Sequence, residues 1–111
     1  MTSSEALHLQ EALLEQVKAL LQGSFGARLR GVVLYGSEAR AEPDSNSDVD
    51  LLVLLAGPVN LGQDLQTIIT TLYPLQLELD QVLEAFPVEE AEYLRGDYAW
   101  YRHAQRDAIR R

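Results

Sequence analysis

Residues 34–55 read LYGSEARAEPDSNSDVDLLVLL, and this stretch decides the fold of the chain and the chemistry that it can support. A short apolar run ends in Gly36-Ser37, and ten residues separate this pair from Asp48 and Asp50, which open a second apolar run. Apolar runs of this length, bounded by turn formers, predict two strands over about 29–35 and 49–55. Both halves of the pattern therefore stand where strands end or begin.

Asp48 and Asp50 form the chemically informative half of this stretch. Residues i and i+2 of a strand point to the same side, so the two carboxylates project from one face, about 6–7 Å apart along the chain. Such charges repel each other unless a cation lies between them or one carboxylate is protonated. Mg²⁺ is typically held by one or two carboxylates together with substrate phosphates, and a Gly-Ser turn offers backbone N–H groups and a hydroxyl to a phosphate. The pattern predicts a metal-dependent phosphoryl or nucleotidyl transferase.

Length and composition exclude several other classes of protein. The 111 residues predict a single domain over 1–111, and the net charge of −8 argues against direct nucleic-acid binding, which calls for basic patches. The absence of cysteine excludes disulfides and thiolate metal sites. No apolar stretch approaches the ~18 residues of a membrane span, and the N-terminus lacks the pattern of a signal peptide. We therefore expect a cytoplasmic protein that does not contact a membrane.

The charge is spread unevenly along the chain. Residues 78–92 hold six acidic and no basic side chains, whereas residues 95–111 hold five arginines against Asp97 and Asp107. Such asymmetry fits a protein partner as well as it fits simple solvation.

Hydrophobic periodicity predicts the elements around the two strands. Apolar residues recur every three or four positions over about 9–21 and 61–72, which predicts two amphipathic helices; Gly23 with Gly26 is expected to end the first, and Asn60 to cap the second. Tyr73-Pro74 is expected to end the second helix. Leucines at 75, 77 and 79 then alternate with polar residues, which predicts a half-buried third strand.

The remaining residues predict helical structure near the C-terminus. Pro87 is expected in the first turn of a short helix that Gly96 ends, and Asp97 is a candidate cap for a last helix. The order helix, strand, strand, helix, strand, helix predicts a small α/β domain whose sheet is covered mainly on one face.

The residues at 34–40 and 47–53 resemble the nucleotidyltransferase superfamily that includes DNA polymerase β, whose signature is Gly-Ser, ten residues, then Asp-x-Asp. They look most like the minimal nucleotidyltransferases (MNT), small prokaryotic proteins that are commonly the antitoxin partners of HEPN-domain toxins. The resemblance implies a polymerase-β-like α/β fold, a mixed sheet with helices mainly on one face. The predicted order of elements agrees with that core.

The resemblance also implies a third acidic residue on a neighbouring strand. On the strand predicted after Pro74, Asp80 is the expected residue and Glu78 the alternative. Asp48, Asp50 and Asp80 would then be the catalytic and metal-binding carboxylates for two Mg²⁺ ions, with Asp80 a ligand or the base toward the acceptor hydroxyl.

Three residues near the first strand are implied to bind the nucleotide. Gly36 would let the triphosphate of ATP approach the backbone, and Ser37 would donate a hydrogen bond to an outer phosphate. Arg40 could add positive charge at the same place.

The function implied by the resemblance is transfer of AMP from ATP onto a tyrosine of a cognate HEPN toxin, an RNase that this modification silences. We then expect a hetero-oligomer with the toxin, because relatives with other acceptors carry an additional acceptor-binding domain. Two alternatives stay open: an antitoxin that acts only by binding the toxin, and a nucleotidyltransferase for a small molecule such as an aminoglycoside. The intact Gly36, Ser37, Asp48 and Asp50 favour catalysis over binding alone.

Overall fold

The computed structural model describes residues 3–35, 49–98 and 109–111, and the side chains among them from residue 11 onward except that of residue 109. The described elements are, in chain order, α1 (Ser3–Phe25), a 3-10 turn (Gly26–Arg28), β1 (Leu29–Tyr35), β2 (Val49–Leu55), α2 (Leu61–Glu78), β3 (Leu83–Glu89), α3 (Glu90–Arg95) and β4 (Ile109–Arg110). None of these helices has both the length and the apolar character that a bilayer crossing requires.

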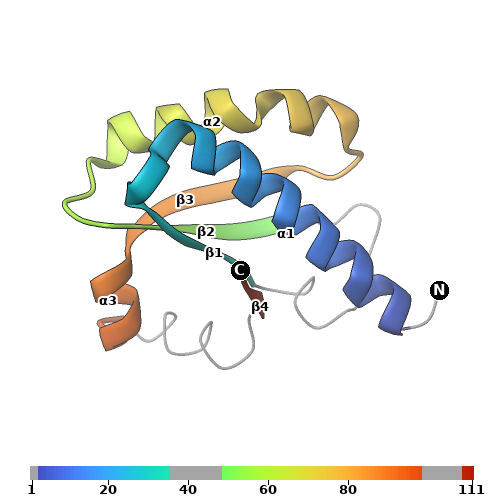
Figure 1. The fold of residues 1–111 in the computed structure, drawn as a ribbon, viewed down its shortest axis with the longest axis horizontal. Helices are drawn as coiled ribbons and strands as arrows, with labels where there is room; N and C mark the ends of the chain where they lie inside the picture. The colour runs from blue at the N-terminus through green and yellow to red at the C-terminus, as the bar shows by residue number, and fades with distance from the viewer. Residues whose placement is uncertain (1–2, 36–48, 99–108) are drawn as a thin grey trace.

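The strands form one mixed sheet in the order β3-β2-β1-β4. β1 is antiparallel to β2 and to the short β4, whereas β2 is parallel to β3, and α2 is the crossover that this parallel pairing needs. Helices α1 and α2 lie together over one side of the sheet, and α3 lies on the other side (Figure 1). The predicted fold class, a small α/β domain with a mixed sheet and helices mainly on one face, is confirmed.

β2 lies at the centre of the core, and its apolar side chains are buried on both faces of the sheet. Four of them pack with residues of α1 and α2, namely Val49, Leu51, Val53 and Leu55. Leu52 and Leu54 face the other side, where they pack with Val33, Val88 and Tyr93. Because side chains alternate along a strand, Asp50 shares the face of Leu52 and Leu54, away from α1 and α2.

Several local predictions are confirmed. β1 and β2 have the expected bounds, and the Oδ1 atom of Asn60 accepts a hydrogen bond of 3.0 Å from the backbone N–H of Gln63 at the start of α2. α1 runs past Gly23 and ends at Phe25, before Gly26, whose φ of 57° lies in the left-handed region that glycine adopts without strain.

The third strand is not where the sequence predicts it. α2 continues through Tyr73-Pro74 to Glu78, so residues 75–78 are helical. Ile68, Leu72 and Leu75 are buried at helical spacing, whereas Leu77 is exposed. Pro74 lies on the exposed side of α2, and so does Thr70, whose carbonyl lacks its usual N–H partner because proline has none. The spacing of the apolar residues every three or four positions therefore determines the structure here, and the alternation of leucines at 75, 77 and 79 does not indicate a strand.

β3 instead covers Leu83–Glu89, and it contains Pro87, which the sequence places wrongly in a helix. The N–H of Val49 on β2 donates to the carbonyl of Val82 (2.8 Å). Every second residue from Val82 onward, including Glu84 and Phe86, therefore directs its N–H and C=O groups toward β2. Pro87 is one of the intervening residues, whose backbone groups point away from β2 toward the outer edge of the sheet. A residue without an N–H is tolerated there, because no neighbouring strand needs a hydrogen bond from it.

The predicted short helix, α3, starts only at Glu90. Gly96 ends it in the left-handed conformation, with φ 68°, as predicted. The helix predicted after Asp97 falls mostly outside the described residues.

An ion pair joins the start of α2 to the turn before β1. Arg28 donates from Nη1 to Oδ1 of Asp64 (3.1 Å) and from Nη2 to Oδ2 (3.0 Å), and Oδ2 also accepts from the backbone N–H of Asn60 (3.0 Å). The Asp64 side chain is 6% exposed. The hydrogen bonds from Arg28 lower the pKa of Asp64, and the bond from Asn60 acts in the same direction. The folded state therefore favours the ionised carboxylate.

We expect Asp64→Asn to lower the free energy of unfolding at pH 7 by about 1–2 kcal/mol, because charge-assisted hydrogen bonds are lost while the exposed part of Arg28 is screened by water. Since the pKa of Asp64 is lower in the folded state, its contribution is present above the ordinary value of 3.8 and is lost as the pH falls below it. Urea unfolding at pH 7 and at pH 3 measures both effects.

Asp97→Asn is the matched control, because the Arg95–Asp97 pair (2.8 Å) is exposed and its loss should leave the stability unchanged. Equal stability of Asp64→Asn and the unmodified chain at pH 7 would contradict a stabilising role for this ion pair.

Candidate functional site

Tyr35, Asp50 and Glu84 lie side by side across three strands. Asp50 pairs with Tyr35 on the antiparallel strand β1 and with Glu84 on the parallel strand β3. Paired residues of neighbouring strands project from the same face, and their strands are about 4.8 Å apart. The two carboxylates are therefore neighbours on the face of the sheet that α1 and α2 leave uncovered.

The electrostatics of this row agree with its geometry. Tyr35 is half-buried, and its pKa is raised first by burial and then by the negative charges of Asp50 and Glu84. Glu84 is exposed and Asp50 is partly exposed, so a ligand can reach both carboxylates. The row is an accessible concentration of negative charge, which suits a cation.

Of the residues that the sequence analysis places in the site, only Asp50 and Asp80 fall within the described residues. Asp50 is the second residue of β2, as predicted. Gly36, Ser37, Arg40 and Asp48 lie outside the described residues, and their roles stay predictions.

The acidic residues predicted on the third strand have other positions. Glu78 is the last residue of α2, and Asp80 is exposed in the connection between α2 and β3. Their placement on a strand is wrong, whereas the role of Asp80 as a third carboxylate stays a prediction.

Glu84 is the residue that sequence reasoning missed. Leu83 and Ala85 face the core beneath α2, while Glu84 and Phe86 face the other side, and this alternation is the signal that could have located the strand. The sequence analysis places a helix here instead, because Pro87 is of a residue type that is common in the first turn of a helix.

Asp50 and Glu84 fit a divalent cation. Neighbouring carboxylates supply the hard oxygen ligands that Mg²⁺ prefers, and a cation relieves their repulsion. Within residues 3–35, 49–98 and 109–111 there is no cluster of three or more metal-binding side chains, so the described part of the chain offers a pair. Asp48, predicted to be a further ligand, precedes β2 directly.

Comparison with known proteins identifies the family. Residues 11–102 match the model of the nucleotidyltransferase domain, so the chain belongs to this family of nucleotidyltransferases. The matched range includes the row of Tyr35, Asp50 and Glu84 as well as the Gly-Ser and Asp-x-Asp residues.

A solved structure supports the fold. The crystal structure of a candidate nucleotidyltransferase from Sulfolobus solfataricus is similar, with a TM-score of 0.59 over 98% of this chain and 86% of that chain, at 19% sequence identity. No curated protein sequence matches this chain. The class of protein is thus given by the family and the fold, a nucleotidyltransferase.

We expect Asp50→Asn and Glu84→Gln each to weaken Mn²⁺ binding by about tenfold or more, because each removes one charged ligand from the site. The free Mn²⁺ signal in electron paramagnetic resonance, followed during titration, measures this affinity. Asp80→Asn tests the competing assignment, and it should bind Mn²⁺ like the unmodified chain if Glu84 is the third carboxylate. Weaker binding in Asp80→Asn, with unchanged binding in Glu84→Gln, would move the third carboxylate to Asp80.

Proposed function

We propose that this chain transfers AMP from ATP to a tyrosine hydroxyl of a HEPN toxin and thereby silences it. The observation that carries the proposal is the pairing of Asp50 with Glu84 on neighbouring strands of a nucleotidyltransferase domain. The antitoxin role and the tyrosine acceptor rest on the resemblance of residues 34–40 and 47–53 to minimal nucleotidyltransferases.

The reaction needs an acceptor oxygen, a base and a bound triphosphate. The acceptor oxygen forms a bond to the α-phosphorus, the bond from that phosphorus to the oxygen bridging to the β-phosphorus breaks, and pyrophosphate leaves. Mg²⁺ bound by Asp48, Asp50 and Glu84 would neutralise phosphate charge and lower the pKa of the acceptor hydroxyl. Glu84, which is exposed on β3, would receive the hydroxyl proton, while Gly36 and Ser37 would hold the outer phosphates.

A second candidate function is an antitoxin that acts by binding alone. The six acidic residues within 78–92 favour contact with a basic protein, which either function would use. The two candidates differ in whether loss of a carboxylate abolishes protection from the toxin.

The candidate toxin for this test is the protein encoded beside this chain. When it is incubated with this chain, ATP and Mg²⁺, intact-mass spectrometry should show that the candidate toxin gains adenylyl groups. We expect Glu84→Gln to slow this transfer by about 10²-fold or more, because a carboxylate that receives the proton is lost. Glu15→Gln, which removes an equal charge at an exposed position of α1, should transfer at an unchanged rate. Transfer by Glu84→Gln at the full rate would refute the role of this residue.

The antitoxin role is tested in cells that express the neighbouring protein as a toxin. Asp50→Asn should keep the fold and lose protection, because the carboxylate serves the transfer and not the core. Full protection by a stable Asp50→Asn variant, measured as growth after toxin induction, would show that binding alone neutralises the toxin.

A further inference from the structure

β3 presents exposed apolar side chains on both sides of Glu84. β3 is the outermost strand on its side of the described sheet. Val82, directly before the strand, is 53% exposed, and Phe86 is 47% exposed. Both share the face of Glu84, because they stand two residues before and two residues after it. The proposed catalytic carboxylate is therefore flanked by two accessible apolar groups.

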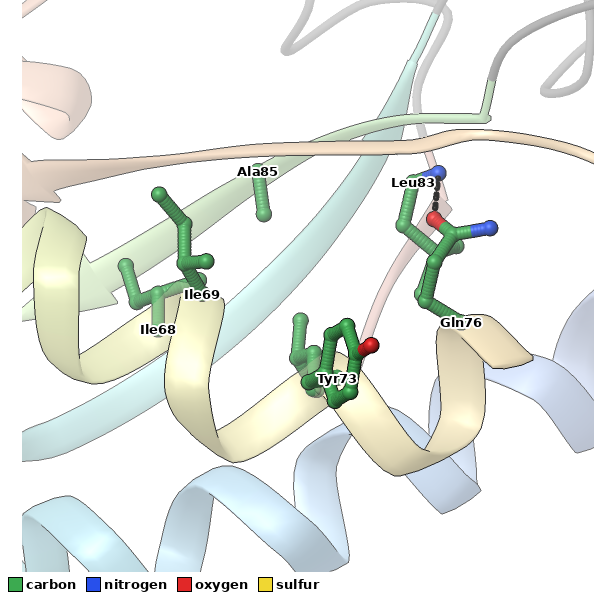
Figure 2. A pocket seen from close by; sticks show the side chains of 7 residues that line it. Ile68, Ile69, Tyr73, Gln76, Leu83 and Ala85 are labelled. Carbon is green, nitrogen blue, oxygen red and sulfur yellow. Dashed lines mark hydrogen bonds between the residues drawn. The ribbon is translucent and has the colours of Figure 1, made fainter. Parts of the chain in front are cut away.

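The opposite face of the same strand borders an apolar groove. Leu83 and Ala85 form one wall, and residues of α2 form the other, including Ile69 and Tyr73 (Figure 2). Ile69 is 53% exposed and Tyr73 is 58% exposed. We call the four exposed residues Ile69, Tyr73, Val82 and Phe86 the β3 edge surface. Ile69 and Tyr73 lie on α2, on one side of β3, whereas Val82 and Phe86 lie on the other side, with Glu84 between these two.

One side chain holds the groove in shape. The Oε1 atom of Gln76 accepts a hydrogen bond of 2.7 Å from the N–H of Leu83, and its Nε2 donates one of 2.8 Å to the carbonyl of Gln81 (Figure 2). These bonds tie the last turns of α2 to the beginning of β3. The groove is thus formed before any partner arrives, which lowers the entropic cost of binding.

The surroundings of the β3 edge surface are acidic. Glu78, Asp80 and Glu84 are exposed, and no basic residue occurs between positions 78 and 92. A nucleic acid is disfavoured there by like charge, and so is the acidic surface of a second copy of this chain, whose net charge is −8. The apolar groups disfavour a polyhydroxylated small molecule. An apolar protein segment flanked by lysine or arginine fits both the exposed apolar side chains and the acidic residues around them.

We propose that the β3 edge surface docks the protein segment that carries the acceptor hydroxyl, an apolar segment with flanking basic residues. The acceptor part of this inference rests on the proposed function. Leu83 and Ala85 line the groove while Glu84, between them, faces the site, and successive residues of a strand are only about 3.3 Å apart. A segment that wraps the edge buries an apolar side chain in the groove and brings its hydroxyl to Glu84.

Binding of designed peptides tests the docking surface without requiring catalysis. The probe is a fluorescein-labelled peptide of fifteen residues with one tyrosine and two leucines between lysines, and its twin carries glutamate in place of lysine. Fluorescence anisotropy should show binding of the lysine peptide and at least tenfold weaker binding of the twin. Ile69→Ser and Tyr73→Ser should each weaken binding of the lysine peptide about tenfold, as expected for apolar anchors.

Two further variants make the result specific. Leu61→Ser removes an exposed leucine at the start of α2 that does not line the groove, and it should bind like the unmodified chain. Glu78→Lys should weaken the lysine peptide and strengthen its twin. Unchanged binding in Ile69→Ser and Tyr73→Ser, or no binding of the lysine peptide, would overturn the proposal.

AMP transfer to the bound peptide, measured by mass, separates this inference from the proposed function. If Ile69→Ser and Tyr73→Ser lower the rate of AMP transfer as well as peptide binding, the result supports both the docking surface and the proposed function. Binding that depends on these residues, without any transfer, would support the docking surface and overturn the proposed function.

Discussion

The burial of β2 on both faces is the constraint on which the rest of the structure depends. Val49, Leu51, Val53 and Leu55 must face α1 and α2, so Asp50 must face the other side of the sheet. A register slip of one residue would turn Asp50 into the apolar core, where an unpaired carboxylate costs several kcal/mol. The same pattern that buries the strand therefore sets the position of the carboxylate.

The sequence predicts those parts of the fold that depend on local patterns, and it fails where tertiary position decides. The bounds of β1 and β2 and the cap at Asn60 are correct because each follows from a nearby apolar run or side chain. Residues 73–89 mislead because Pro74 lies on the exposed side of a helix and Pro87 at the edge of a sheet, and neither environment is visible in the sequence. The sequence predicts Asp50 as a site residue from the Asp-x-Asp pattern, and it does not predict Glu84.

β3 carries both the proposed third carboxylate and part of the proposed docking surface. Its parallel pairing with β2 places Glu84 beside Asp50, and its position at the outside of the described sheet leaves Phe86 accessible. The acidic stretch of residues 78–92 thus has two proposed uses, since Glu84 serves the site while Glu78 and Asp80 favour a basic partner. Such an arrangement suits a nucleotidyltransferase whose acceptor is a large molecule that approaches from the side.

The most direct test of nucleotidyl transfer is the identity of the group that leaves ATP. With ATP labelled at the γ-phosphate, Mg²⁺ and the protein encoded beside this chain, attack at the α-phosphorus releases the label as pyrophosphate. We predict labelled pyrophosphate in amounts equal to the adenylyl groups gained by the acceptor, and none with Asp50→Asn. Label transferred to the acceptor, or released only as inorganic phosphate, would contradict a nucleotidyltransferase mechanism at Asp50 and Glu84.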